Sequence, residues 1–264
     1  MAFTAHNIRL QDGTETLPEA GWLIADSPWT QAALRTLRLF YGEDLPGKSI
    51  VDLGCLEGGY TLEFARADMQ AVGFEVRSSN FENCLRVKRE AGVQRLDFIQ
   101  DDVWNLGSYQ MFDAAFCCGL LYHLDRPAEF IRMIASRVRD VVILHTHFAT
   151  DRDETMFGLS PMSENEGLPG RWLHEHDLDD PVKLDLHKWT SWSNKRSFWL
   201  TKPALIQLLK DSGFDLVYEQ YDMLGRDIRE SMESGYYDQQ SRGMFVGVRT
   251  TSLPASSVPS SAPA

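Results

Sequence analysis

Short apolar runs and amphipathic stripes alternate along most of the chain. Runs of Val, Ile, Leu and Phe between turn residues predict buried strands, whereas apolar residues spaced by three and four predict helices. The predicted strands are residues 49–53, 71–76, 96–100, 112–118, 141–144, 214–220 and 244–248. The predicted helices are residues 28–40, 60–67, 79–91, 127–138 and 201–212. This alternation predicts an α/β fold: a doubly wound, mostly parallel sheet with helices on both faces.

Turn and cap residues refine this outline. A hydroxyl at Ser27 before Pro28 predicts the start of the first helix, Ser78 or Ser79 is expected to cap the third, and Thr201 the last. No helix of comparable strength separates the last two predicted strands. We therefore expect these two strands to pair antiparallel at an edge of the sheet.

Three segments depart from the alternation. Residues 1–47 precede the first strand, and we expect them to form a helical segment over the site. Residues 151–197 interrupt the alternation and contain ten acidic residues, six basic residues and three Trp. A segment of this length and aromatic content predicts a substrate lid over the open end of the sheet. Residues 48–250 would form the catalytic domain, and residues 251–264, rich in Ser, Pro and Ala, a disordered tail.

Charge and composition narrow the partners. The formal net charge of −12 argues against nucleic acid and anionic membrane surfaces, because binding a polyanion requires a basic face. No apolar run reaches the length of a membrane span, and the first ten residues do not resemble a secretory leader, so we expect a cytoplasmic protein. The four cysteines contain no C-x-x-C spacing, which predicts free buried thiols; a zinc site is the alternative.

An acidic residue stands at the end of each of the first three predicted strands. Asp52 precedes the turn at Gly54 and suits a positively charged ligand group. Glu75 follows Gly54 by 21 residues, where a carboxylate can accept two hydrogen bonds from a ribose diol. Asp102 can accept a hydrogen bond from an adenine amino group, with Val103 against the ring. The alternatives for these residues are a plain strand-to-helix turn, a surface acid and a helix cap.

With these residues the chain resembles the class I S-adenosylmethionine-dependent methyltransferases. The matching features are VDLG at 51–54, Glu75, Asp102 and the stretches 112–119 and 213–214. The resemblance implies a Rossmann-like sheet of seven strands, the last inserted antiparallel, and S-adenosylmethionine as cofactor. By resemblance, the cofactor would be bound by Asp52, Gly54, the backbone near Cys55, Glu75, Val76, Asp102, Val103 and the backbone near Cys118. Leu56 departs from the glycine that is usual at its position.

A narrower resemblance covers residues 118–127 and 199–214. These stretches are similar to the bacterial enzymes that carboxymethylate the wobble uridine of tRNA. In those enzymes the tyrosine that matches Tyr122 contacts the carboxyl group of a carboxylated cofactor.

Several side chains near the predicted strand ends are candidates for chemistry. His123, His145 and His147 follow the fourth and fifth strands, and imidazole titrates near neutral pH, so each is a candidate general base. Each has a structural alternative as a capping or packing residue. His174 and His176 resemble a metal pair, but in an acidic loop we expect them to be solvated, and no metal is predicted. A substrate carboxylate could instead meet a basic side chain, namely Arg152, Arg171, Lys195, Arg196, Arg226, Arg229 or Arg242.

We therefore expect a methyltransferase acting on a small-molecule acceptor, with a homo-oligomer compatible with the sequence. The alternatives are a tRNA-modifying methyl or carboxymethyl transferase, an NAD-dependent oxidoreductase and a non-catalytic cofactor-binding protein. The oxidoreductase is disfavoured because the chain lacks G-x-G-x-x-G at the first turn and a Tyr-x-x-x-Lys pair.

Overall fold

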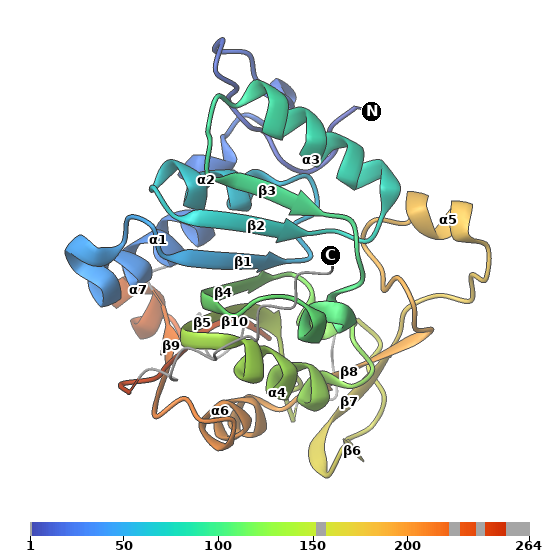
Figure 1. Cartoon of the computed structure of the whole chain (residues 1–264). Helices are drawn as coiled ribbons and strands as arrows, with labels where there is room; N and C mark the ends of the chain where they lie inside the picture. Colours follow the sequence, from blue (N-terminus) through green and yellow to red (C-terminus); the bar gives the residue numbers. More distant parts are fainter. Residues whose placement is uncertain (1, 152–156, 222–227, 236–240, 252–264) are drawn as a thin grey trace, which may run out of the picture.

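A seven-stranded sheet organises the chain (Figure 1). The computed structural model describes residues 2–151, 157–221, 228–235 and 241–251. The strand order is β3-β2-β1-β4-β5-β10-β9, with β10 antiparallel to both of its neighbours and the pairs among β1 to β5 parallel. The strands are β1 (Ser49–Leu53), β2 (Gln70–Phe74), β3 (Leu96–Ile99), β4 (Phe112–Cys118), β5 (Val138–His147), β9 (Leu216–Gln220) and β10 (Arg242–Val248). The predicted doubly wound, mostly parallel sheet is confirmed.

The last two strands pair antiparallel as expected, but only β9 lies at the edge. β10 is inserted between β5 and β9. Its residues are buried from Gly243 to Val248, whereas β9 is exposed or half-buried along its length. A strand buried on both faces gains most from a neighbour on each side, which places β10 inside the sheet.

Helices cover both faces of the sheet, and each face has its own apolar core. α1 (Pro28–Tyr41), α2 (Gly59–Arg66) and α3 (Ser78–Glu90) pack on one face, and α4 (Pro127–Arg137) and α6 (Lys202–Asp211) on the other. Two shorter helices are α5 (Pro181–Leu186) and α7 (Ile228–Glu233). The 3₁₀ helices are Pro18–Ala20, Ile24–Asp26, Gly42–Asp44, Val103–Ser108 and Leu121–His123.

Two of the three predicted helix caps are present. The hydroxyl of Ser27 accepts the N–H of Thr30, and that of Thr201 accepts the N–H of Ala204. The prediction for α3 was wrong, because neither Ser78 nor Ser79 caps it and the residue at the cap position is Arg77. Other partners engage both serine hydroxyls: that of Ser78 accepts from Gln100, and that of Ser79 donates to the carbonyl of Asp185.

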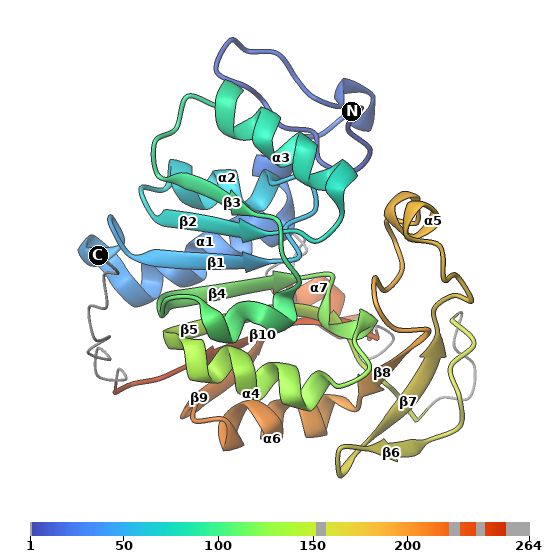
Figure 2. The ribbon, with the colours of Figure 1, turned by 45° about the vertical axis from the view of Figure 1, so that its right-hand side comes forward.

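The segment expected to be irregular contains a second sheet. Its antiparallel strands are β6 (Ser163–Asn165), β7 (Leu168–His174) and β8 (Arg196–Leu200). Figures 1 and 2 show α5 beyond the carboxyl ends of β1 and β2, and the second sheet on the same side of the molecule, nearer to α4 and α6. That this insertion acts as a substrate lid stays a prediction. The three strands were not predicted. β6 and β7 bury few side chains, whereas β8 is buried from Ser197 to Leu200 but is a short run directly before the helix that begins after Thr201.

The N-terminal region is less helical than predicted. Before α1, its helical structure consists of two 3₁₀ turns, and the rest of residues 2–27 is irregular or forms isolated bridges and turns. Residues 252–264 of the predicted tail at 251–264 lie outside the described residues, as do the candidates Arg152 and Arg226. Among the residues that the structure describes, no helix has the length and apolar character needed to cross a bilayer.

Gly58 provides a test of the packing beneath the first turn. Its φ of +80° is left-handed, and an added Cβ would lie 2.6 Å from Cζ of Phe98. Gly58→Ala should lower the free energy of unfolding by about 2–4 kcal/mol, from backbone strain plus overpacking. Gly107→Ala is the matched control, because nothing lies within 4 Å of its Cβ position, and its effect should stay within about 0.5 kcal/mol. Chemical denaturation measures both, and equal effects would contradict this account.

Candidate active site

A covered cavity of about 280 Å³ lies where the strand order reverses between β1 and β4. Its walls come from the segments that follow β1, β2, β3 and β4, from the start of β10, from the N-terminal region and from the lid. This is the edge at which parallel α/β sheets bind ligands. We call residues 188–193, which cover it, the lid segment.

The turn after β1 brings backbone to the cavity. Gly54 has φ +73°, and an added Cβ would lie 3.3 Å from Leu120, so the turn requires the small residue found there. Leu56 also has a left-handed φ of 55°, which is unusual for a residue with a side chain. Its N–H donates to Oε2 of Glu75 at 3.0 Å, and this bond helps to hold the strained residue.

Glu75 is almost completely buried directly after β2. Besides Leu56, it accepts the backbone N–H of Arg77 at 2.8 Å through Oε1. Burial raises the pKa of this carboxyl to about 7, although the hydrogen bonds from Arg77 and Leu56 oppose the shift. Glu75 lines the cavity, so its remaining acceptor capacity faces the ligand space.

Asp102 combines the two roles weighed for it from the sequence. Oδ1 accepts the N–H of Trp104 and caps the 3₁₀ helix Val103–Ser108. Oδ2 has no hydrogen-bond partner in the part of the chain that the structure describes, and the residue lines the cavity beside Val103 and Trp104. The aromatic ring of Trp104 was not predicted as part of the site.

Four predicted site residues do not line the cavity: Asp52, Cys55, His145 and His147. The His147 ring stacks on that of Trp199, with their centres 4.7 Å apart. Asp52 lies within β1, where its carboxylate accepts the hydroxyl of Thr61 at 2.6 Å and burial raises its pKa to about 7. Cys55 is buried beneath the turn, 3.8 Å from the sulfur of Cys84. His145 is buried under α1, and its ring lies 5.5 Å from that of Trp29. For Asp52 and His145 the side chain projects from a face of the sheet rather than from its end.

The other predicted site residues line the cavity together. They are Gly54, Glu75, Val76, Asp102, Val103, Cys118, Tyr122 and His123. Burial raises the pKa of the Cys118 thiol to about 11, so the thiol is protonated at neutral pH. As expected, all four cysteines are free, and three of them are fully buried.

His123 is paired with a carboxylate that the sequence did not single out. Its Nδ1 lies 2.9 and 3.1 Å from the two oxygens of Glu175, which follows β7. Glu175 also accepts from Ser197 and from the N–H of Ser191. Burial raises the pKa of Glu175, but these hydrogen bonds outweigh burial and hold the pKa below its usual range. An ionised carboxylate only accepts, so in the neutral form of His123 the proton is on Nδ1 and Nε2 is the acceptor.

Tyr122 and Arg242 form a polar corner of the same cavity. The Arg242 guanidinium lies 5.4 Å from the centre of the Tyr122 ring. Its Nε is buried without a hydrogen-bond partner, and within the described ranges no carboxylate pairs with it. A guanidinium in this state favours an anionic ligand. Arg242 was one of seven basic candidates in the sequence, and the start of β10 selects it.

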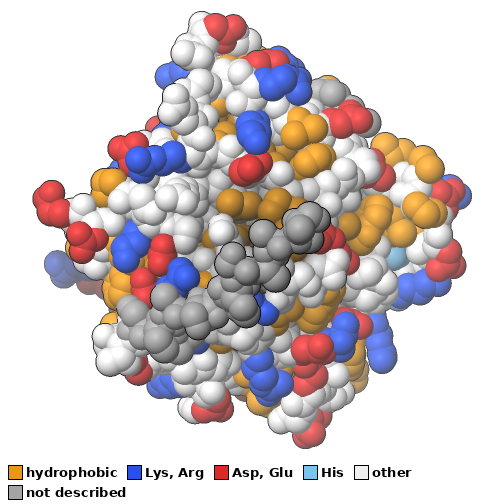
Figure 3. Space-filling model, viewed as in Figure 1, with side chains coloured by type: hydrophobic (Ala, Val, Ile, Leu, Met, Phe, Trp, Pro, Cys, Tyr) orange, Lys and Arg blue, Asp and Glu red, His pale blue; other side chains and the backbone are white. Residues whose placement is uncertain are grey.

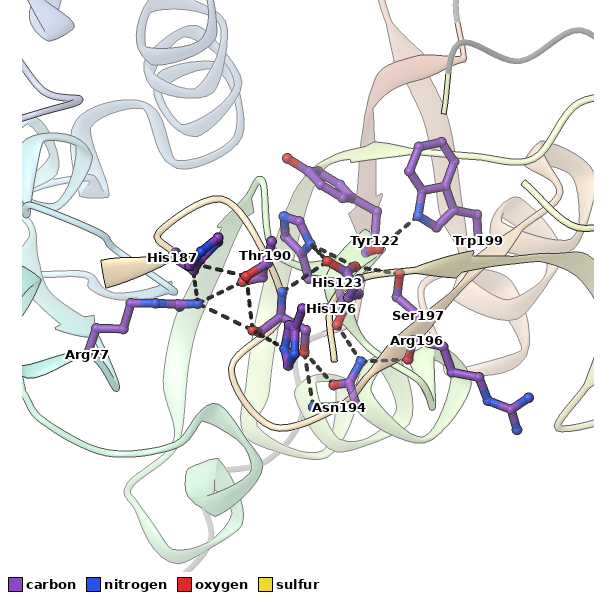
Figure 4. Close-up of polar contacts among 12 residues, drawn as sticks. Arg77, Tyr122, His123, His176, His187, Thr190, Asn194, Arg196, Ser197 and Trp199 are labelled. Carbon is purple, nitrogen blue, oxygen red and sulfur yellow. Dashed lines mark hydrogen bonds and ion pairs between the residues drawn. The ribbon is translucent and has the colours of Figure 1, made fainter. Parts of the chain in front are cut away.

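Arg77 holds one side of the lid against the body of the domain. Arg77 donates to the backbone carbonyls of Leu184, His187 and Thr190 at 3.2, 3.0 and 2.8 Å. Figure 4 shows Arg77 at one side of the lid and Tyr122 with Trp199 at the other. There the Trp199 indole donates to the carbonyl of Tyr122. The lid is thus fixed at both ends of the cavity.

His174 and His176 of the insertion make contacts within the insertion and do not line the cavity. The expectation that both are solvated was wrong for His176, which is buried and bonded through Nε2 to the carbonyl of Ser191. His174 is exposed, as expected, and pairs with Asp177. Within the described parts of the chain, no group of three His, Cys, Asp or Glu side chains could hold a metal ion. Trp189 and Trp192 of the lid segment also line the cavity.

Comparison with known proteins decides the family. Residues 28–219 of the chain match a protein family that is described as a methyltransferase domain. The chain belongs to the methyltransferase domain family. The predicted cofactor, S-adenosylmethionine, agrees with this family, whereas the oxidoreductase alternative does not.

Individual relatives of this methyltransferase domain are distant. The tRNA U34 carboxymethyltransferase of Idiomarina loihiensis is 24% identical over 195 residues, covering 68% of this chain and 60% of that protein. The ubiquinone biosynthesis O-methyltransferase of Proteus mirabilis is 28% identical over 112 residues, 40% of this chain and 45% of that protein. The N-terminal domain of EvdMO1 with SAH bound shares the fold, with a TM-score of 0.62, 22% identity and 85% and 82% coverage.

The anchoring role of Arg77 can be tested by Arg77→Lys. An ammonium group cannot reproduce the planar fork that reaches three carbonyls, so the lid should open more often. Amide hydrogen exchange over residues 184–192 should accelerate by about ten- to a hundredfold. Arg89→Lys, at an exposed position on α3, is the control and should leave these rates unchanged. Unchanged protection in Arg77→Lys would mean that other contacts hold the lid.

Proposed function

We propose that this methyltransferase domain transfers a methyl group from S-adenosylmethionine to a small-molecule acceptor inside the covered cavity. The observation that carries the proposal is the His123–Glu175 pair, which provides an acceptor nitrogen in a cavity lined by the lid segment. When bound, the cofactor supplies an activated methyl group on a sulfonium. The chain must then position the acceptor, exclude water and remove a proton where the acceptor requires it.

The residues along the cavity suit this cofactor from one end to the other. Glu75 would accept hydrogen bonds from the ribose hydroxyls, and Asp102 would accept one from the adenine amino group through its unpaired Oδ2. Val103 would lie against the adenine ring. Gly54 has no side chain and would leave room for the methionine moiety of the cofactor. The backbone near Cys118 would pass beside the same moiety.

His123 would act as the general base when the acceptor is a hydroxyl or another protonated nucleophile. Glu175 holds the imidazole in the tautomer with a basic Nε2 and stabilises the imidazolium that forms. Asn194 donates to the carbonyl of His123 at 3.0 Å and fixes its backbone. Tyr122 packs 4.3 Å from the His123 ring, so the base and the polar corner at Arg242 lie together. A base and an anion-binding group side by side suit an acceptor that carries an acidic group.

The surface around the cavity does not favour a polyanion. On the face shown in Figure 3, Lys and Arg side chains are interspersed with Asp and Glu, and apolar side chains gather over α5. The exposed apolar residues there include Val182, Leu186 and Trp189. Lys195, beside the lid, is paired with Asp179 at 2.8 Å. A tRNA substrate would instead require a continuous basic surface.

A second candidate function is transfer of a carboxymethyl group from a carboxylated cofactor. The unpaired Arg242 beside Tyr122 supports it, because the pair could bind the carboxylate of the transferred group. The relatives that carry out carboxymethylation of tRNA also favour it. Both candidates place an anion at Arg242, and they differ in whether that anion belongs to the acceptor or to the cofactor.

If Glu75 binds the ribose, the affinity of the protein for a ribose-containing ligand should depend on pH. With a pKa of about 7, the carboxyl is largely protonated at pH 5.5 and ionised at pH 8.5, and only the ionised form accepts from both ribose hydroxyls. The affinity for 5′-methylthioadenosine should therefore rise by about tenfold over this range. Calorimetry measures it with a ligand that has the ribose but does not itself titrate there. In Glu75→Gln the rise should disappear, and the same rise in that variant would remove Glu75 from this role.

The acceptor class can be identified by following a labelled methyl group. The protein is incubated with methyl-labelled S-adenosylmethionine and, in separate reactions, with a metabolite extract or purified tRNA. We expect label in the metabolite reaction and none in tRNA. His123→Ala should reduce this turnover by about 10²–10⁴ without changing cofactor affinity. The exposed His174→Ala serves as the control.

Two outcomes would overturn the first proposal. Label found only in tRNA would exclude a small-molecule acceptor. Transfer seen only with carboxylated S-adenosylmethionine, and lost in Arg242→Gln, would establish the second candidate instead.

A further inference from the structure

The first described residues are held against the cavity by one buried carboxylate. Glu57, in the turn after β1, accepts the backbone N–H groups of Thr4, Ala5 and His6 at 2.8, 3.0 and 2.9 Å. Burial raises the pKa of Glu57, but these hydrogen bonds outweigh burial and hold the pKa below its usual range. Lys188 of the lid segment lies 3.6 Å from the same carboxylate. The N-terminal region and the lid therefore meet at Glu57.

This arrangement presents the His6 ring to the cavity in one tautomer. Nδ1 accepts the N–H of Gly59, the first residue of α2, at 3.0 Å. Burial lowers the pKa of His6 to about 4, despite the opposing effect of Glu57, so the ring is neutral at neutral pH. A neutral imidazole that accepts at Nδ1 carries its proton on Nε2. Nε2 has no hydrogen-bond partner among the residues that the structure describes, and His6 lines the cavity.

His6 lies at the methionine end of the expected cofactor site. Its side-chain contacts are with Gly59 and with Tyr60, whose ring centre is 5.1 Å from its own. Both belong to the start of α2, directly after the turn at Gly54 that would line the methionine moiety. The residues expected to bind the ribose and the adenine follow β2 and β3 instead.

We propose that His6 is a cofactor-binding residue whose Nε2–H donates a hydrogen bond to the carboxylate of the methionine moiety. The carboxylate only accepts, and the fixed N–H donor of His6 matches it. Glu57 is then a positioning residue, because it holds the backbone that carries His6. The inference depends on the cofactor and not on the acceptor proposed above, so failure of one leaves the other standing.

Two substitutions separate the two nitrogens of the ring. His6→Asn places an acceptor near the position of Nδ1 and removes the donor at Nε2, whereas His6→Gln retains a donor near Nε2. Each variant is titrated by calorimetry with S-adenosylmethionine and with its decarboxylated form, which differs only by the missing carboxylate. In the wild type, the affinity for S-adenosylmethionine should exceed that for the decarboxylated form. His6→Asn should weaken binding of S-adenosylmethionine by about tenfold or more and leave the decarboxylated ligand within about twofold.

Comparing the affinities of each variant for the two ligands shows whether His6 binds the carboxylate or only supports the fold of the N-terminal region. His6→Gln should preserve most of the preference for the carboxylated ligand, and His174→Asn, at an exposed imidazole, should preserve all of it. If His6→Asn weakens both ligands equally, His6 acts only by holding the N-terminal region and the proposal is wrong. It is equally wrong if neither affinity changes, in which case Lys188→Gln and Arg242→Gln are the next variants, since both residues line the same cavity.

Discussion

The carboxylate of Glu75 joins the segments from which the site is built. One oxygen accepts the N–H of Leu56 in the turn after β1, and the other accepts the N–H of Arg77 after β2. These N–H groups lie just beyond the strands, where backbone donors need a partner outside the ladder. Because Glu75 fixes the backbone of Arg77, it also directs the guanidinium that holds the lid. The floor and the cover of the cavity therefore depend on one buried side chain.

Concentrating buried acids at this edge has an electrostatic consequence. Burial raises the pKa of Asp52 and of Glu75 to about 7, from ordinary values of 3.8 and 4.5. Their contribution to the free energy of unfolding is thus fully present below the ordinary values and is lost as the pH rises through about 7. Glu57 behaves in the opposite way: its lowered pKa contributes stability above the ordinary value of 4.5, lost as the pH falls below it. A bound ligand that donates hydrogen bonds to ionised Glu75 would restore part of the stability that is lost when this buried carboxyl ionises.

Both covers of the cavity originate far away in sequence from the strands they cover. The N-terminal region is attached through Glu57, and the lid through Arg77 and through Glu175, which pairs with His123. The insertion therefore also supplies the carboxylate that contacts Nδ1 of His123.

The sequence alone determined most of the sheet and the ligand-side edge. Near-continuous apolar strands can be recognised locally, and because parallel strands present their carboxyl ends at one edge, residues just after them must meet. Glu75, Asp102, Tyr122 and His123 follow strands in this way and do line the cavity. In the second sheet, β6 and β7 escaped prediction because they bury few side chains, and the pattern of apolar residues therefore does not reveal them. β8 is buried from Ser197 to Leu200 and was missed although most of these side chains are apolar.

Only the tertiary structure decided which side chains act together. Asp52 and His145 are strand residues whose side chains face the helices, a consequence of pleat and register that strand ends alone do not reveal. His6, Arg77 and Glu175 reach the site through contacts across 53, 113 and 52 positions of the chain. Such contacts arise from the packing of segments onto the sheet, and no local pattern of residues encodes them. For the same reason one arginine among seven basic candidates, Arg242, was selected only when the start of β10 placed it beside Tyr122.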